Sequence, residues 1–269
     1  MSTPFLRPGR STRWLAGVAL AWLAGIAVAE ADPIRFAVAA EPYPPFAVKQ
    51  ADGQWQGFEV DLIHALCTQM KAECKVDEVA WDGIIPSLLG DKVDVIFASM
   101  SITDEREKQI AFSHAYYDTP VAVAGLAGTK LDISPAGLKG KVVGAQISTV
   151  SANYLKEHYE KIADIRYYDT QDSANADLVA GRIDLMLADG TAVSDFVKSA
   201  DAKAANIVNL GTVPHDPLFG RGVGAGLRKQ DTALKGKLDK AIETLLASDD
   251  YTRLEKKYFD IDVRPKAGQ

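Results

Sequence analysis

The sequence predicts an α/β protein built from two strand–helix units, each with parallel-type strands covered by helices. Short apolar strands alternate with helices over residues 34–112, and they alternate again over residues 141–188. The pattern changes near residues 117–120 and again near 214–217, where prolines interrupt the chain. Such alternation implies parallel sheets whose ligands bind at the carboxyl ends of the strands.

The first 29 residues have the features of a secretory signal peptide. Three arginines precede an uncharged apolar run over residues 14–28, which is too short and too rich in Ala and Gly for a comfortable membrane span. Small residues at the end of this run fit an A-x-A cleavage site. We therefore expect cleavage of residues 1–29 and export of a soluble mature protein, with an uncleaved anchor as the alternative.

The charge balance argues against nucleic acid or an anionic membrane as a partner. The chain has 30 Lys and Arg against 36 Asp and Glu, and three of the arginines lie in the predicted signal peptide. The remaining net charge is near −9, which repels phosphate-rich surfaces. About 240 residues remain, enough for one large or two modest domains.

Cys67 and Cys74 are the only cysteines. An isolated pair this close should be bridged in an oxidising compartment. A two-cysteine metal site would need further ligands, and the nearest histidine, His64, has no partner at a suitable spacing. We therefore expect a disulfide, no metal and no cofactor.

In the first unit, aromatic and polar residues stand where strands end. Strands are expected at 34–39, 76–80 and 93–98, a return edge strand at 55–58, and helices at 60–71 and 81–90. Three prolines within residues 41–46 hold that loop extended, so Tyr43 is displayed rigidly. Trp81 stands where a strand gives way to a helix.

The segment 99–106, Ser-Met-Ser-Ile-Thr-Asp-Glu-Arg, is the first candidate for a binding site. Ser99 and Ser101 follow a strand, and Thr103 is a good N-cap for a helix expected over 107–112. Arg106 then lies in the first turn, so hydroxyls, N–H groups and a guanidinium converge on a place for a small carboxylate or phosphate. The alternative is a capped surface helix with an ordinary exposed arginine.

In the second unit the polar candidates again follow strands. Strands are expected at 121–126, 141–146, 165–168 and 183–188, and helices at 149–161 and 173–180. Ser148 and Thr149 cap the first of these helices, and Asp189 ends the last strand.

The C-terminal part begins with the glycine-rich segment 220–226, which partly fits a dinucleotide fingerprint. Pro214 and Pro217 interrupt the strand that such a site needs, so we favour a glycine-rich crossing strand. Helices are expected at 231–247 and 250–258.

Together these segments resemble the periplasmic solute-binding proteins that serve polar amino acid ABC transporters, most closely the lysine/arginine/ornithine, histidine and opine members. The similar segments span the whole mature chain and are 43–46, 57–62, 67–74, 81–86, 99–106, 180–184, 222–228 and 257–260.

The resemblance implies a type II periplasmic binding protein fold, in which two α/β lobes with helices on both faces of their sheets close on a ligand. The implied divisions are lobe 1 at 32–118 plus 223–269, lobe 2 at 123–214, and hinge strands near 119–122 and 215–222.

The resemblance also assigns the zwitterionic end of an amino acid ligand. Arg106 matches the arginine that pairs with the α-carboxylate, helped by Ser101 and the Thr149 backbone N–H. Asp189 matches the acid that receives the α-ammonium, with Ser99 nearby. A zwitterion taken out of water needs one fixed cation and one fixed anion, so the chemistry agrees with the resemblance.

The other end of the ligand is less well specified. Tyr43 and Trp81 match the aromatics that enclose the side chain. Family members often carry an acid three residues before the tyrosine, where this chain has Ala40, and Glu41 stands one residue closer. Either Glu41 reaches the cleft or the preference for cationic ligands is weakened. Two further positions, Ala98 and Val150, make this end more apolar.

We therefore predict a monomeric binding protein for arginine, ornithine, lysine, histidine or an opine that delivers its ligand to an ABC permease. One alternative is an enzyme resembling a periplasmic cyclohexadienyl dehydratase of the same fold. Asp189 argues against it, because such a site should have no ammonium receptor. A second alternative is a ligand-gated sensor that docks on a receptor.

Overall fold

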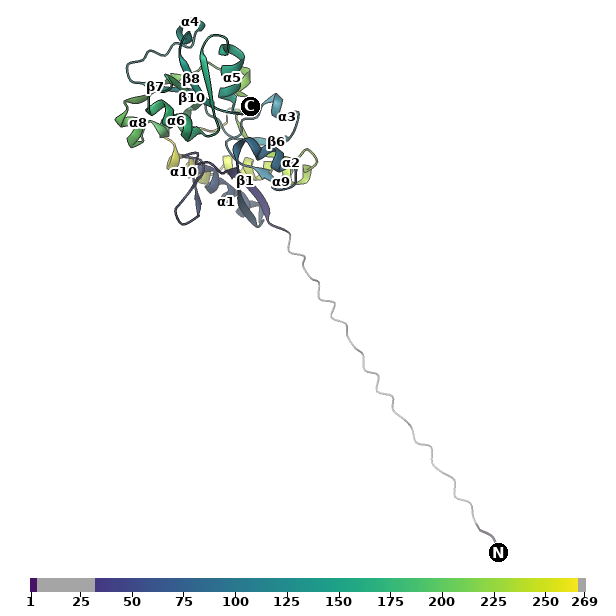
Figure 1. Cartoon of the computed structure of the whole chain (residues 1–269). Helices are drawn as coiled ribbons and strands as arrows, with labels where there is room; N and C mark the ends of the chain where they lie inside the picture. The colour runs from purple at the N-terminus through teal and green to yellow at the C-terminus, as the bar shows by residue number, and fades with distance from the viewer. Residues whose placement is uncertain (4–31, 266–269) are drawn as a thin grey trace. The chain divides into compact units, whose positions relative to one another are not determined.

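The computed structural model describes residues 1–3 and 32–265 (Figure 1). The predicted signal peptide falls almost entirely on residues 4–31, which lie outside the described residues, so it stays a prediction. Residues from 32 onward form one compact unit. In the part of the chain described, none of the helices combines the length and the apolar character needed to cross a membrane.

The first sheet has five strands in the order β4-β1-β5-β12-β6. Their bounds are β1 Ile34–Ala39, β4 Cys74–Val79, β5 Val95–Ile96, β6 Ala111–Tyr117 and β12 Val223–Leu227. Strand β1 pairs in parallel with β4 and β5, whereas β12 runs antiparallel to β5 and β6. A strand from late in the chain is thus inserted into a sheet formed by its first part.

The second sheet also has five strands, in the order β11-β7-β10-β8-β9. Their bounds are β7 Val121–Leu126, β8 Val142–Gln146, β9 Asp164–Tyr168, β10 Leu185–Asp189 and β11 Ile207–Thr212. Strand β8 pairs in parallel with β9 and β10, and β7 runs antiparallel to β10 and β11. The chain therefore crosses between the sheets twice, between Tyr117 and Val121 and between Thr212 and Val223.

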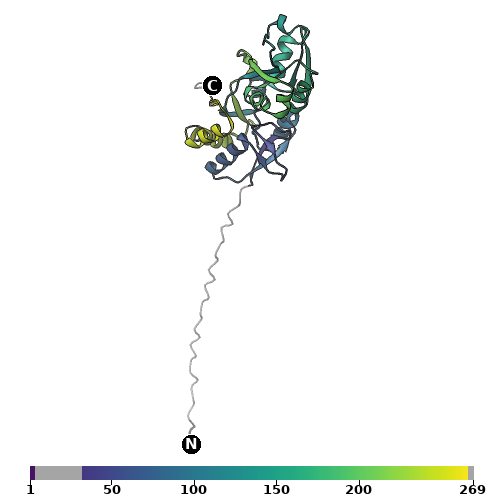
Figure 2. The same cartoon turned by 90° about the vertical axis from the view of Figure 1, so that its left-hand side faces the viewer.

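Each sheet has its own set of helices. Those around the first are α1 Phe58–Met70, η1 Trp81–Gly83, α2 Ile84–Leu89, α3 Asp104–Glu107, α9 Thr232–Leu246 and α10 Asp249–Tyr258. Those around the second are α4 Pro135–Leu138, α5 Val150–Tyr159, α6 Gln171–Val179, α7 Gly190–Phe196 and α8 Ala200–Ala204, and η2 Pro217–Phe219 lies in the return crossing. Figure 2 shows the C-terminal helices beside α1, from the other end of the sequence.

The predicted α/β class, with two parallel-type sheets and surrounding helices, is confirmed. Most elements match their expected ranges within a few residues. The edge strand expected at 55–58 is only β3 Trp55–Gln56, paired with β2 Val48–Lys49. The lobe boundaries and the hinge movement stay predictions.

One helix prediction is wrong. The helix expected over 107–112 is the single turn α3, which ends at Glu107, and the following residues form β6. Thr103 does cap α3, since its side chain accepts from the Arg106 N–H. Strand β6 forms instead of more helix because it pairs with β12, about a hundred residues later in the chain. The sequence also left α7, α8 and β11 unassigned.

The predicted disulfide joins Cys67 in α1 to Cys74 at the start of β4, with the two Cα atoms 6.2 Å apart. It connects the last turn of α1 to the edge strand of the first sheet. The bridge therefore holds one end of the helix whose other end lies near the cleft described next.

Candidate functional site

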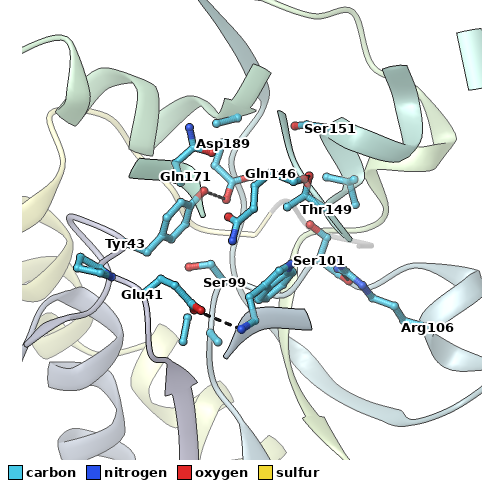
Figure 3. Close-up of a pocket in the computed structure, with 16 residues that line it drawn as sticks. Glu41, Tyr43, Ser99, Ser101, Arg106, Gln146, Thr149, Ser151, Gln171 and Asp189 are labelled. Carbon is cyan, nitrogen blue, oxygen red and sulfur yellow. Dashed lines mark hydrogen bonds between the residues drawn. The ribbon is translucent and has the colours of Figure 1, made fainter. Parts of the chain in front are cut away.

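A partly open cavity lies where the strand ends of the two sheets meet (Figure 3). Eight of the nine predicted site residues line it, namely Glu41, Tyr43, Trp81, Ser99, Ser101, Arg106, Thr149 and Asp189. They come from both sheets, because carboxyl ends of parallel strands from each side open onto the same space.

Ser148 is the predicted residue that does not line the cavity. Its backbone carbonyl accepts a hydrogen bond from Arg106, so it contacts the site through the main chain. Three polar lining residues were missed, Gln146, Ser151 and Gln171. Gln146 ends β8, and Gln171 begins α6 after β9. Both could have been predicted, because ligand-binding residues are expected where parallel strands end.

Arg106 is held rigidly with its charge unpaired. Its guanidinium donates to the Ser101 carbonyl at 2.8 Å and to the Ser148 carbonyl at 3.0 Å. It also lies over the Trp81 ring, 5.5 Å from the centroid. Burial lowers the pKa of Arg106 to about 10. Among the described residues no carboxylate forms a salt bridge with it.

Asp189 is the corresponding anion. One carboxylate oxygen accepts the Tyr43 hydroxyl at 2.7 Å, as Figure 3 shows. Burial raises the pKa of Asp189 to about 6, although the Tyr43 hydrogen bond and the positive charge of Arg106 pull it down. Burial and the adjacent carboxylate raise the pKa of Tyr43 well above its usual value. The carboxylate therefore has a hydrogen-bond donor but no paired cation within the described residues.

Three hydrogen bonds connect the loops of the first sheet to those of the second across the cavity. Besides the bonds from Tyr43 to Asp189 and from Arg106 to Ser148, the Trp81 indole N–H donates to the Ile147 carbonyl at 3.1 Å. The three donors all belong to residues predicted to contact a ligand. The site is therefore closed by the same side chains that line it.

Glu41 reaches the cavity. It is one of the lining residues, and its Oε2 accepts the Trp81 backbone N–H at 3.2 Å (Figure 3). This bond holds the carboxylate against the backbone at the junction of β4 and η1. The structure therefore has Glu41 in the cleft, which is the first of the two alternatives given above.

The opposite wall of the cavity includes the N-terminus of α5. Thr149 is the N-cap, with its hydroxyl accepting the Ala152 N–H at 3.1 Å. The first N–H groups of a helix have no acceptors within it and carry the positive end of the helix dipole. Together with Arg106, this arrangement favours a negative group at this side of the cavity.

The described residues contain no cluster of three or more His, Cys, Asp and Glu side chains suited to a metal ion. What the cavity holds instead is one fixed cation, one fixed anion, a second carboxylate and two aromatic side chains. Such a set can receive a small molecule that carries both charges.

Comparison with known proteins places the chain in a family. Residues 34–261 match bacterial extracellular solute-binding proteins, family 3. The chain belongs to this family.

Two relatives and one solved structure illustrate the similarity. The L-arginine-binding protein of Pseudomonas aeruginosa is 38% identical over 251 residues, covering 93% of this chain and 96% of the relative. The histidine-binding periplasmic protein of Salmonella typhimurium is 37% identical over 234 residues, covering 86% and 90%. A structure of an ancestral arginine-binding protein bound to arginine has a TM-score of 0.77 and 28% identity, covering 86% of this chain and 99% of the other.

These relatives are binding proteins, which agrees with the expectation that this family member is not an enzyme. The predicted resemblance to the periplasmic amino acid binders is confirmed by the family match and by the identities of the relatives.

The raised pKa of Asp189 predicts a pH-dependent cost to the stability of the ligand-free protein. The folded state holds this proton up to about pH 6, whereas the unfolded chain loses it near pH 3.8. Stability should therefore fall as the pH rises from about 4 through 6. Asp189→Asn keeps an oxygen to accept the Tyr43 hydroxyl and removes this cost. We expect the variant to exceed the wild type by on the order of 1 to 3 kcal/mol at pH 8 and to match it at pH 4.

Denaturant unfolding of both proteins at the two pH values measures this difference. The other titrating groups are common to both proteins, so the difference reports mainly the burial of Asp189, with a smaller part from Glu59, whose pKa the Asp189 charge raises. An unfolding free-energy difference that is the same at pH 4 and pH 8 would contradict the burial cost assigned to this carboxylate.

Proposed function

We propose that this family member binds an L-amino acid with a cationic side chain, arginine foremost, between its two sheets and delivers it to an ABC importer. The observation that carries the proposal is the pair of unpaired charges, Arg106 and Asp189, facing the same cavity. A buried charge without a partner is costly, so both are expected to gain a counter-ion from the ligand.

The carboxylate of the ligand would lie against Arg106 and the N-terminus of α5. Guanidinium binds a carboxylate through two parallel hydrogen bonds, and helix N–H groups add to the attraction. The Ser101 hydroxyl lines the same part of the cavity. Arg106 already donates to two carbonyls, which fix its orientation before the ligand arrives.

The α-ammonium would lie against Asp189 and Ser99. The Asp189 carboxylate has further lone pairs beyond the one that accepts from Tyr43, so it can accept from an ammonium group as well. Binding a cation at this place would also pull the pKa of Asp189 back toward its usual range.

The side chain of the ligand would extend between Tyr43 and Trp81 toward Glu41. An aromatic ring and a carboxylate suit a cationic, partly planar group such as guanidinium. The names of the relatives support this preference, since they are described as binding arginine and histidine. Ornithine, lysine, histidine and opines share the required charges and stay candidates.

The cellular setting is part of the proposal. A cleaved signal peptide at residues 1–29 would export the chain to the periplasm, where the Cys67–Cys74 disulfide is stable. There a monomer would deliver its ligand to an inner-membrane permease. The family description, extracellular solute-binding proteins, supports this location.

Replacing Arg106 by Ala should abolish amino acid binding. The ligand carboxylate would be left buried without its cation, which costs about 2 to 5 kcal/mol or at least thirtyfold in affinity. Stability should change little, because Arg106 forms no salt bridge among the described residues. Calorimetric titration of the refolded, ligand-stripped protein with L-arginine measures the effect.

Arg253→Ala is a matched control, because Arg253 is a largely exposed arginine that pairs with Asp250 in α10, outside the cavity. It should bind like the wild type. Affinity of Arg106→Ala within threefold of this control would show that Arg106 is not the carboxylate receptor.

Glu41→Gln should lower the preference for a cationic side chain without removing binding. L-Citrulline is a neutral analogue of L-arginine with nearly the same shape. We expect the ratio of the affinities for L-arginine and L-citrulline to fall by about tenfold, as for the loss of one partly exposed charge pair. Competition titrations with the two ligands give the ratio directly. An equal loss of affinity for both ligands would mean that Glu41 shapes the cavity but does not interact with the charge of the ligand side chain.

A further inference from the structure

Behind the ammonium end of the cavity lies a buried carboxyl group that does not line it. Glu59 is in the first turn of α1 and is only 1% exposed. Gly57, with φ at 139°, allows this close packing, since a Cβ there would lie 2.1 Å from the Phe46 carbonyl oxygen. The start of α1 is thereby pressed against the loop that carries Tyr43, and Glu59 points into the protein.

Both oxygens of Glu59 are engaged, and its partners connect it to the cavity. Oε1 accepts the Ser99 backbone N–H at 2.7 Å and also the Tyr116 hydroxyl. Oε2 accepts the Ser99 hydroxyl at 3.1 Å. Ser99 itself lines the cavity and has a φ of 53°, which is uncommon for a residue other than glycine. Glu59 thus holds both the backbone and the hydroxyl of a residue that faces the ligand.

The direction of the Ser99 hydrogen bond depends on whether Glu59 carries a proton. A carboxylate can only accept, so the Ser99 hydroxyl then donates to it and turns its lone pairs to the cavity. A neutral carboxyl must place its proton on one oxygen. Oε1 already accepts from the Ser99 N–H, which cannot accept in return, and from the Tyr116 hydroxyl, which has no other hydrogen-bond partner among the described residues. The proton therefore belongs on Oε2 and is donated to the Ser99 oxygen. The Ser99 hydroxyl must then direct its own proton away from Glu59.

We propose that Glu59 is a positioning residue that sets the polarity of the Ser99 hydroxyl: ionised Glu59 leaves both lone pairs of the Ser99 oxygen free to accept from the ligand ammonium, and neutral Glu59 occupies one of them and weakens that acceptor. The inference rests on the proposed function, since it assigns a determinant of ammonium recognition at the same site. It adds a residue that does not line the cavity.

The surroundings of Glu59 place this change in an accessible pH range. Burial raises the pKa of Glu59 to about 7, and the hydrogen bonds from Tyr116 and Ser99 act in the opposite direction. The titratable groups that face it are Tyr116 and Tyr117 of β6, Tyr43 and Asp189, and no cation is among those that shift its pKa. Affinity for an amino acid should therefore fall as the pH drops through about 7, and fall again as Asp189 takes up its proton near pH 6.

Glu59→Gln reproduces the neutral state at every pH. The amide oxygen must face the Ser99 N–H, so the amide nitrogen donates to the Ser99 hydroxyl. We expect affinity for L-arginine at pH 8 to fall on the order of tenfold, as for a weakened hydrogen bond to a charged group. The part of the pH dependence near pH 7 should disappear, while the part due to Asp189 stays.

Two further variants test whether Glu59 acts by setting the direction of the Ser99 hydrogen bond or only by supporting the local structure. Tyr116→Phe keeps the ring and removes one hydrogen bond to the carboxylate, so the pH midpoint of binding should move upward. Ser99→Ala removes the hydroxyl through which Glu59 acts, so adding Glu59→Gln to it should cost little more. Glu255→Gln, a change at a second buried glutamate that accepts from Val263, is the control and should leave the pH profile unchanged.

The measurement is the affinity for L-arginine between pH 5.5 and 8.5, by calorimetry, for the wild type and these variants. Carbon-13 NMR of the glutamate carboxyl groups in the ligand-free protein reports the Glu59 titration independently and should give a midpoint near 7 that is missing in Glu59→Gln. Identical pH profiles for the wild type and Glu59→Gln, or a Glu59 midpoint below 5, would overturn the inference. Failure of the wild type to bind any amino acid at any pH would instead overturn the proposed function.

Discussion

The site depends on two opposite charges that share a cavity without forming an ion pair. Arg106 is fixed by backbone carbonyls and an aromatic ring, and Asp189 by the Tyr43 hydroxyl. Each is desolvated, and each has its pKa moved toward the neutral form by burial. Each is held by partners of its own, and the two do not form a salt bridge with each other. A ligand that carries a negative and a positive charge at the right separation would compensate the desolvation of Arg106 and of Asp189 together.

Local sequence patterns predicted most of the fold because they depend on short-range physics. The cap at Thr103, the cap at Thr149 and the glycine-rich strand 223–227 all have clear local signatures. The error at 107–112 came from a non-local cause, since β6 exists only through its pairing with β12. Periodicity within a few residues cannot contain that information.

The site was predicted in good part because strand ends of parallel sheets converge. That rule and the family resemblance brought Tyr43, Ser99, Arg106 and Asp189 to one cavity before any coordinates were used. Glu59 could not be found in this way, because a glutamate in the first turn of a helix ordinarily indicates a favourable helix end on the surface. Only the packing around Gly57 and Ser99 reveals that it is buried behind the site.

The central claim, that the cavity requires both charges of a zwitterion, is tested most directly by calorimetric titration of the ligand-stripped protein with three related molecules. L-Arginine carries both charges, agmatine lacks the carboxylate, and argininic acid has a hydroxyl in place of the α-ammonium. The account predicts tight binding of L-arginine and a loss of at least a hundredfold for each analogue, as for a buried charge left unpaired. Agmatine or argininic acid binding within a few fold of L-arginine would contradict it.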